Sequence, residues 1–354
     1  MRTGIANLPL HYGKCPSWLF EKMRKLAKLI IEAIIYEFGV EEFLRRISDP
    51  YFFQSFGCVL AYDWHSSGLS TTVCGAIKEA LRGTEKSLGL FVVGGKGKTS
   101  RKAPLEIENY GQKFSLDFVP RLIYASKMSA KIDNSCLQDG FQIYHHTFIF
   151  TKKGQWTVVQ QGMNPEIQMA RRYHWLSEDV KSFVNEPHSA ICCDWQGKPL
   201  NLVAKESNKT REISTEIVRA PFNVLLKDLK KIRILNMPHY HWIPLSSASE
   251  KRIQKTLFTA HEQKPRNYEE LVSYQGIGPK TLRALALISE LIYGAKPSFR
   301  DPVRYSFTHG GKDGYPRPID KKQYDQSISI LEKAVRKAKL KAQEKSQALK
   351  SLYN

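Results

Sequence analysis

FQIYHHTFIFTKKGQWTVVQQGM (residues 141–163) is the stretch that decides the fold. Aromatic and β-branched residues recur with a period of two on both sides of TKKG, which is the pattern of two antiparallel strands joined by a turn. Upstream, GLFVVGG (89–95) has the composition of a further strand. The centre of the chain is therefore predicted to be a β-hairpin within a sheet.

Helices are predicted before this hairpin. Apolar residues recur at helical spacing in SWLFEKMRKLAKLIIEAIIYEFG (17–39), which stops at a glycine, and shorter helices are predicted for VEEFLRRIS (40–48) and TTVCGAIKEALRG (71–83). After the hairpin, NPEIQMARRYHW (164–175) is predicted to start another helix. Short strands and turns are expected from there to about residue 235.

The C-terminal part is predicted to be helical, over 246–263, 267–274, 279–294 and a lysine-rich amphipathic segment at 326–354. The fold class is therefore α+β, with a mixed N-terminal part built around the hairpin and a helical C-terminal part. Three domains are expected, covering residues 1–240, 241–320 and 321–354.

The charge balance indicates the class of partner. The chain has 354 residues and a formal net charge of +20, from 54 Lys and Arg against 34 Asp and Glu. Such a chain favours a polyanion, and nucleic acid above all. There is no apolar run of about 18 residues and no secretion signal, so no membrane contact and a cytoplasmic, nucleoid-associated location are expected. The six cysteines form no CxxC pair, which predicts buried thiols and no metal or cofactor.

YQGIGPKT (274–281) predicts the nucleic-acid contact. Gly276 and Gly278 make a tight turn between two helices, where free N–H groups and the positive end of the second helix suit a phosphate. Ile277 is expected to anchor the turn between the helices, and these residues and Thr281, which follows them, are expected to contact DNA. The pattern L-x-x-x-x-G-I-G-x-K resembles the helix-hairpin-helix, a sequence-independent grip on DNA.

Lys280 adds chemistry to this turn. In the helix-hairpin-helix DNA glycosylase superfamily, bifunctional members carry a lysine in the form G-V-G-x-K-T and an aspartate about one helix later. The resemblance implies that Lys280, uncharged and buried at the helix start, attacks the sugar C1′ and that Asp301 takes up a proton. The simpler alternative is that Lys280 clamps a phosphate and that Asp301 is a loop residue or helix cap before Pro302.

A wider resemblance covers most of the chain. RTGIANLPLHYGKCPSWLFEKM (2–23), FGCVLAYDWHSSGLSTTV (56–73), WTVVQQGMN (156–164) and ARRYHWLS (170–177) resemble a group of thermophile archaeal and bacterial proteins long filed only as a domain of unknown function. Members have been associated with removal of 5-hydroxymethyluracil from DNA. The resemblance implies a partner, double-stranded DNA with a modified base, and a glycosylase activity that needs no cofactor.

Such an enzyme extrudes the base and reads its edge with polar and aromatic side chains. The candidates for the base pocket are Asp63, Trp64, His65, His145, Gln160, Gln161, Tyr173, His174 and Trp175. Strand alternation sends His145 and His146 to opposite faces, so at most one of them can face a pocket. Arg171 and Arg172 are expected to pair with phosphates. The alternative for each candidate is that it is an ordinary core or surface residue without a role in binding.

Two other functions fit the same sequence. A metal-dependent nuclease is possible because His239 and His241, or Asp63 and His65, place two ligand types two residues apart. A non-enzymatic DNA-binding repair scaffold needs only the glycine turn and the basic C-terminal helix. The preferred lesion, strand scission after base release and the oligomeric state stay open.

Overall fold

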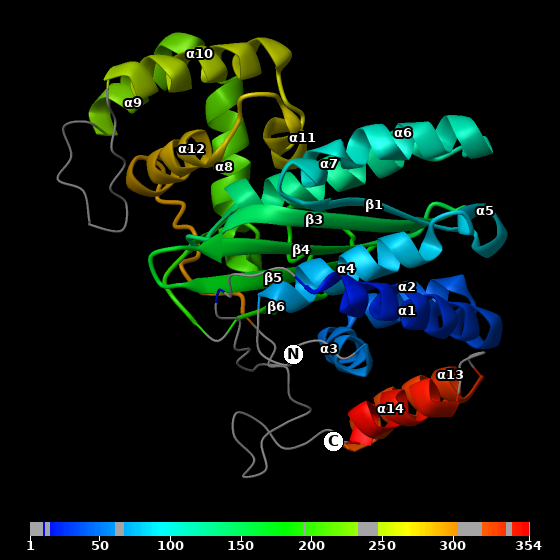
Figure 1. Ribbon diagram of the computed structural model, residues 1–354. Helices are drawn as coiled ribbons and strands as arrows, with labels where there is room; N and C mark the ends of the chain where they lie inside the picture. The colour runs from blue at the N-terminus through cyan, green and yellow to red at the C-terminus, as the bar shows by residue number, and fades with distance from the viewer. Residues whose placement is uncertain are drawn as a thin grey trace.

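A five-stranded antiparallel sheet lies at the centre of the computed structural model, which describes residues 10, 15–60, 67–193, 195–232, 247–303, 321–337 and 342–353 (Figure 1). The strand order is β1 (Leu90–Lys96), β3 (Gln142–Thr151), β4 (Trp156–Asn164), β5 (Met169–Leu176) and β6 (Ala190–Cys192). A small second sheet pairs β2 (Leu137–Gln138) with β7 (Leu200–Asn201). With helices on both faces of the main sheet, the fold is α+β, as predicted.

The predicted hairpin is confirmed as β3 and β4. Their register places Phe150 opposite Trp156, and Thr151 N–H donates to the Gln155 carbonyl at 2.9 Å to close the turn. Gly154 has φ +86°, and a Cβ there would lie 2.9 Å from the Phe118 ring. A glycine is needed at this turn because of both its φ and the close approach of the ring.

The helix predicted to start within 164–175 is wrong, because β5 occupies this segment. Asn164 Oδ1 accepts from Glu166 N–H, which makes the preceding residues a turn rather than a helix start. Ala170 and every residue of the strand after it are buried. Because both faces are buried, the strand lacks the polar and apolar alternation that a half-exposed strand displays.

One face of the sheet is covered by the N-terminal helices α1 (Ser17–Phe38), α2 (Val40–Ser48), α3 (Pro50–Val59) and α4 (Gly68–Leu81). Their apolar side chains form one buried cluster with Val92, Ile149 and Val159 of the sheet. α13 (Lys321–Lys337) joins this cluster through Leu331 and Val335, and α14 (Ala342–Tyr353) follows it. The C-terminal segment is thus docked on the body of the protein instead of extending from it.

The other face carries α7 (Val119–Ser135), with α6 (Ala103–Phe114) beside it, and a helical part stacked above (Figure 1). The helical part consists of α8 (Asn208–Arg219), α9 (Phe222–Ile232), α10 (Ser247–Gln263), α11 (Tyr268–Ser273) and α12 (Pro279–Leu291). The remaining short elements are α5 (Glu85–Leu88) and two 3₁₀ turns, Gly97–Lys102 and Lys205–Ser207. α8 and α9 replace the strands and turns expected before residue 235 and pack with α10 and α12.

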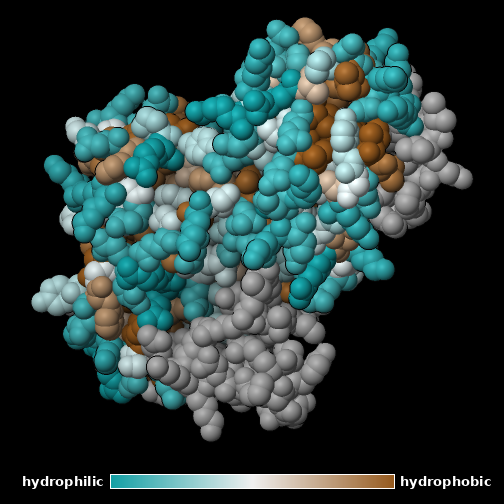
Figure 2. All heavy atoms as spheres, turned by 180° about the vertical axis from the view of Figure 1, so that it is seen from behind, coloured by the Kyte–Doolittle hydropathy of each residue, from teal (hydrophilic) through white to brown (hydrophobic). Residues whose placement is uncertain are grey.

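Apolar side chains gather over this helical part at the top right of Figure 2. The exposed ones from α9, α10, α12 and the turn after α12 are Val224, Phe258, Leu291 and Tyr293. Among the described residues, no helix is long and apolar enough to cross a membrane. All six cysteines are free thiols, and burial raises the pKa of Cys74, Cys136 and Cys192 to about 12.

A buried ion pair ties the sheet to the chain that follows α12. Arg171 of β5 has no exposed area and donates to Asp139 Oδ2 and Asp301 Oδ2, at 2.9 Å in each case. Asp139 also accepts from Tyr173 Oη at 2.7 Å. Removing one partner of such a pair leaves an uncompensated buried charge, which is strongly unfavourable.

We expect Arg171→Met to lower the free energy of unfolding by about 3–5 kcal/mol, because Asp139 and Asp301 stay buried without their cation. The control is Arg45→Met, which breaks a pair with Glu178 whose arginine side chain is 46% exposed and should cost at most about 1 kcal/mol. Urea unfolding of both variants measures the difference, and equal losses would contradict the assignment.

Candidate nucleic-acid interface

Two helices joined by a glycine turn form the candidate interface. Asn267 caps α11 by accepting from Glu270 N–H at 2.9 Å, and α12 begins with Pro279 at its first position. Between them Gly276 has φ +87°, a backbone conformation that is strained for any residue with a side chain. A Cβ there would also lie 3.3 Å from Thr256 of α10. Gly278 has an extended backbone, which other residues also adopt, so its backbone conformation does not require a glycine.

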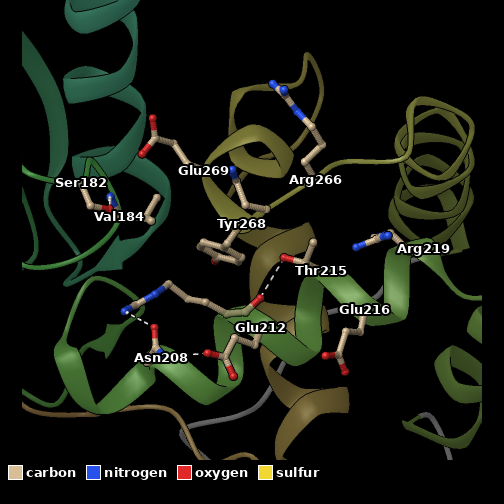
Figure 3. A pocket seen from close by; sticks show the side chains of 12 residues that line it. Ser182, Val184, Asn208, Glu212, Thr215, Glu216, Arg219, Arg266, Tyr268 and Glu269 are labelled. Atoms are coloured by element: carbon tan, nitrogen blue, oxygen red, sulfur yellow. Dashed lines mark hydrogen bonds between the residues drawn. The ribbon is translucent and has the colours of Figure 1, made fainter.

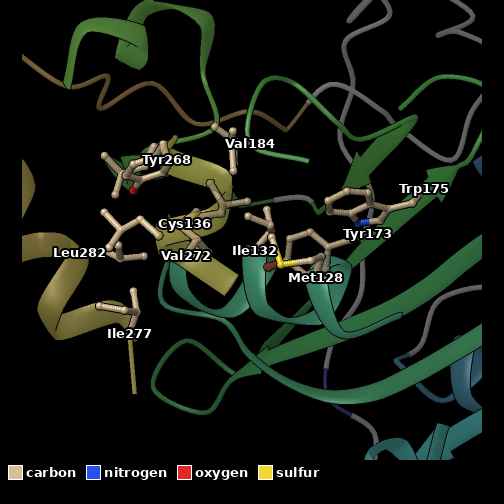
Figure 4. Close-up of a cluster of buried hydrophobic side chains, with 14 of the residues drawn as sticks. Met128, Ile132, Cys136, Tyr173, Trp175, Val184, Tyr268, Val272, Ile277 and Leu282 are labelled. Atoms are coloured by element: carbon tan, nitrogen blue, oxygen red, sulfur yellow. The ribbon is translucent and has the colours of Figure 1, made fainter. Parts of the chain in front are cut away.

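Ile277 anchors the turn from within. Its side chain is 2% exposed and belongs to the buried cluster that includes Val272 of α11, Leu282 of α12 and Ile132 of α7. In Figure 4, Ile277, Leu282 and Val272 lie close together beside α11 and α12, and Ile132 lies further along the same cluster, toward the sheet. The predicted anchoring role of Ile277 is confirmed, and burial of the isoleucine leaves the flanking glycines at the surface.

The outer side of the turn presents hydrogen-bond donors. Within the described chain, the N–H groups of Gly276, Gly278 and Lys280 have no hydrogen-bond acceptor. They lie at the N-terminus of α12, where unpaired N–H groups and the helix dipole attract anions. Thr281 is 4% exposed and faces the interior, so the expectation that it contacts DNA is wrong.

Polar contacts hold the turn from below. Lys131 of α7 donates to the Tyr274 carbonyl at 2.5 Å, and burial lowers the pKa of this lysine. Gln138 of β2 donates to the Pro279 carbonyl at 2.8 Å and accepts from Arg283 at 2.6 Å. Sequence reasoning did not single out Lys131 or Gln138, because their contacts join segments more than 140 residues apart.

Lys280 is exposed at the start of α12, so the expectation that it is buried is wrong. Asp301 lies elsewhere: its carboxylate accepts from Arg171 and from the N–H groups of Gly197 and Val303, at 2.9 to 3.0 Å. Lys280 is not among the donors to Asp301. The hydrogen bonds of Asp301 therefore favour a structural role over the catalytic role expected from its spacing.

The prediction that Arg171 and Arg172 pair with phosphates is wrong, since neither has any exposed area. Arg171 forms the ion pair described above. The guanidinium carbon of Arg172 lies 4.6 Å from the centre of the Phe53 ring, and its Nη1 is 3.3 Å from Ser70 Oγ. Both arginines belong to the core, on opposite faces of β5.

Three of the expected pocket residues, Gln160, Tyr173 and Trp175, lie on the α7 face of the sheet, around Asp133, which has no exposed area. Asp133 accepts hydrogen bonds from Gln160, Trp175 and the nearby His188. Tyr173 donates to Asp139 on the same face. His146 continues the network, with Gln160 Oε1 at 2.8 Å and Ser126 at 3.0 Å. Sequence reasoning missed Asp133 and His188, because only the fold brings them together.

The other face holds His145, Gln161 and His174, which confirms that His145 and His146 point to opposite sides. His145, Gln161 and Arg172 stand opposite one another on β3, β4 and β5, in one row across the sheet. Gln161 donates to Ser67 at the start of α4. Within the described residues His145 Nδ1, Gln161 Oε1 and His174 Nε2 are buried without a hydrogen-bond partner.

Part of the predicted site lies outside the described residues, namely Asp63, Trp64, His65, His239, Tyr240 and His241. Across the ranges that the structure describes, no group of three or more His, Cys, Asp or Glu side chains is placed to hold a metal ion.

A cleft of about 400 Å³ opens between α8 and the start of α11 (Figure 3). Its charged lining residues are of both signs: Arg211, Arg219, Arg266, Glu212, Glu216 and Glu269. Arg211 is committed to the Leu202 and Ala204 carbonyls. This balance of charge distinguishes the cleft from the glycine turn and does not favour a polyanion.

Comparison with known families matches residues 4–319 to the family described as Protein of unknown function (DUF763). The chain belongs to this family. The expected membership in a family without an assigned function is confirmed, while the associated activity stays a prediction. No curated protein and no solved structure matches the chain.

The buried histidines of this DUF763 protein predict acid sensitivity. Burial lowers the pKa of His145 to about 3 and lowers the pKa of His146 and His174. Because histidines of the unfolded chain protonate below about pH 6.5, the free energy of unfolding should fall below that pH, by up to about 1.4 kcal/mol per pH unit for each histidine. Urea unfolding between pH 4 and 7 measures this slope.

His145→Gln should make the free energy of unfolding depend less steeply on pH between pH 4 and 7, because the contribution of His145 is lost. Thr147→Ala is the control, because it removes the hydrogen bond to His145, 3.1 Å long, and leaves the titrating group in place. A slope that is the same in His145→Gln and in the unaltered chain would rule out a neutral His145 in the folded state.

Proposed function

We propose that this protein is a DNA glycosylase that binds duplex DNA through the turn between α11 and α12 and removes a modified pyrimidine, with 5-hydroxymethyluracil as the best candidate. The observation that carries the proposal is the exposed Lys280, directly after a turn with a left-handed Gly276 and a buried Ile277. The lesion itself is suggested by family resemblance.

DNA binding is supported by the surface around the turn. Its unpaired N–H groups suit one backbone phosphate, as in a helix-hairpin-helix grip. Lys127, Lys255 and Lys280 are exposed on α7, α10 and α12, the three helices that surround the turn. Since phosphate contacts release counterions, affinity for DNA should decline steeply with salt.

The lysine supplies a nucleophile. Its unprotonated amine attacks C1′ of the extruded nucleotide, the bond from C1′ to the base breaks, and the base leaves with the electron pair and takes up a proton. The lysine nitrogen then loses a proton and the C1′–O4′ bond breaks, with O4′ taking up a proton, which gives an imine. The imine favours loss of a C2′ proton and breakage of the bond from C3′ to the 3′ phosphate, and water then releases the lysine. Asp301 is assigned to the ion pair with Arg171, so solvent accepts the lysine proton.

Base reading is placed on the α4 face of the sheet. Rejecting thymine requires buried polar groups that stay unpaired when the hydroxyl is missing, which can discriminate by about 10⁴ or more. His145 Nδ1 and Gln161 Oε1 are buried, neighbouring and without a partner in the described part of the chain. They lie at the end of the sheet where Gln138 contacts the turn and Arg171 holds Asp301.

A non-enzymatic DNA-binding scaffold is the second candidate, favoured by the engagement of Asp301 away from Lys280. A metal-dependent nuclease would use residues outside the described ranges. Incubation with duplexes that each carry one modified base, in the presence of a chelator and borohydride, separates the three. A glycosylase releases the base and is trapped on the DNA, a nuclease is silenced by the chelator, and a scaffold only binds.

Lys280→Ala should abolish the borohydride-trapped adduct and reduce base release by roughly 10³-fold or more, because the nucleophile is gone. Lys280→Arg should keep DNA binding but form no adduct, since its guanidinium is not nucleophilic. Lys296→Ala, at an exposed position beyond the end of α12, is the control and should behave like the unaltered chain. Trapping by Lys280→Ala would refute the mechanism.

Gly278→Asp should weaken binding to every DNA sequence alike, because its carboxylate faces the phosphate site. The fold should tolerate it, since the backbone is extended and a Cβ at Gly278 meets only the Gly276 carbonyl oxygen at 3.9 Å. Gly278→Asn has nearly the same shape without the charge and should bind more tightly than Gly278→Asp, by a factor that shrinks with salt. Fluorescence anisotropy at several salt concentrations measures this. Equal affinities at low salt would speak against a phosphate at this turn.

A further inference from the structure

An aromatic hollow lies at the opposite end of α7 from the glycine turn. Its volume is about 650 Å³, and its lining combines the first turns of α7, the turn between β3 and β4, and the loop after β5. Four aromatic residues contribute: Phe118, Tyr124, Trp156 and Phe183. We propose that this hollow stacks an unpaired base of the DNA strand held at the glycine turn, an inference that rests on the proposed function.

The rings pack against one another and present Tyr124 at the rim of the hollow. Trp156 and Phe183 are within 13° of parallel with centroids 6.0 Å apart, and Tyr124 meets Phe183 at 89° and 5.6 Å. Tyr124 is 39% exposed. Its hydroxyl donates to Glu269 at 2.9 Å, which fixes the ring at the rim. Fixed aromatic platforms of this kind bind bases without sequence preference.

The lining of the hollow contains two cations, Arg121 and Lys153, and one carboxylate, Glu178. Glu178, at its rim, is paired through both carboxylate oxygens with Arg45, at 2.8 and 2.9 Å. The neighbouring Asp179 has its pKa raised by burial and by Glu178. Arg121 is exposed and lies over the Phe118 ring at 5.8 Å, and within the described residues it has no carboxylate partner. The lining residues therefore carry a net positive charge, while Glu269, which accepts from Tyr124 and from Phe183 N–H, adds a carboxylate beside them.

One face of α7 connects the hollow to the glycine turn. Tyr124, Lys127 and Lys131 follow at i, i+3 and i+7, which places them on one side of the helix. Tyr124 lines the hollow, and Lys131 donates to Tyr274 at the turn. Their separation of seven positions along the helix spans about 10 Å, which is roughly three stacked nucleotides. The hollow is thus too far from the turn for the target base and suits a base a few nucleotides away.

The substrate class that follows is duplex DNA with unpaired nucleotides beside the bound segment. The probes are a 30-base-pair duplex and the same duplex with a three-nucleotide single-stranded gap, bound to the full chain in a chelator and followed by anisotropy. The unaltered protein should prefer the gapped duplex by about 5- to 100-fold, the contribution of one stacked base.

Tyr124→Ala should abolish this preference and leave affinity for the intact duplex unchanged. Tyr124→Phe keeps the ring, loses only the hydroxyl, and should retain the preference. Phe183→Leu is a second variant, which should also lose it, and circular dichroism verifies that each variant is folded. Gly278→Asp should weaken binding to both probes equally.

Equal affinity of the unaltered chain for both probes would overturn the inference and leave the proposed function standing, as would a preference that survives both ring variants. Saturable binding of a polyproline peptide without any gap preference would assign the hollow to a peptide and overturn it too. Failure to bind either DNA would overturn the proposed function itself.

Discussion

The buried guanidinium of Arg171 is the constraint on which the functional end of the molecule depends. It has no exposed area, and its counter-charges come from Asp139, just after β2, and from Asp301, beyond α12. Separating them would leave charges in the core, which costs several kcal/mol. The sheet, the small sheet and the chain after α12 therefore move as one unit. The Asn201 amide reinforces this tie by donating to the Arg300 carbonyl at 3.0 Å.

The exposed turn is rigid because of what lies beneath it. Gln138 adjoins Asp139 and donates to Pro279, Lys131 donates to Tyr274, and Ile277 is sealed in the core. Two segments distant from the turn in sequence, β2 and α7, thus fix the turn from its inner side. A binding group on a supported element holds its geometry better than one on a free loop, so the order of the turn comes from the core.

The sequence predicted what is local and missed what is tertiary. Periodicity was enough for the β3 and β4 hairpin and for α1, α2, α10, α11 and α12. β5 was misread because two arginines in a strand buried on both faces contradict the usual pattern, and their partners are remote. The turn could be predicted because its glycines and isoleucine act within five residues. The burial of Asp301 could not be predicted, because its distance along the sequence from Lys280 does not reveal that it pairs with Arg171.

In the proposed function, affinity and selectivity depend on different residues. The buried Arg171 and Arg211 are satisfied by a carboxylate pair and by carbonyls, so they contribute little to the external field of a chain with net charge +20. The surplus acts through exposed lysines such as Lys127 and Lys280, which attract any phosphate backbone and distinguish no sequence. Discrimination requires fixed polar atoms away from water, and His145 with Gln161 are such atoms. The lysines lie on the α7 side of the sheet and these polar atoms on its α4 face, so in the proposed function both sets depend on the sheet that the ion pair of Arg171 secures.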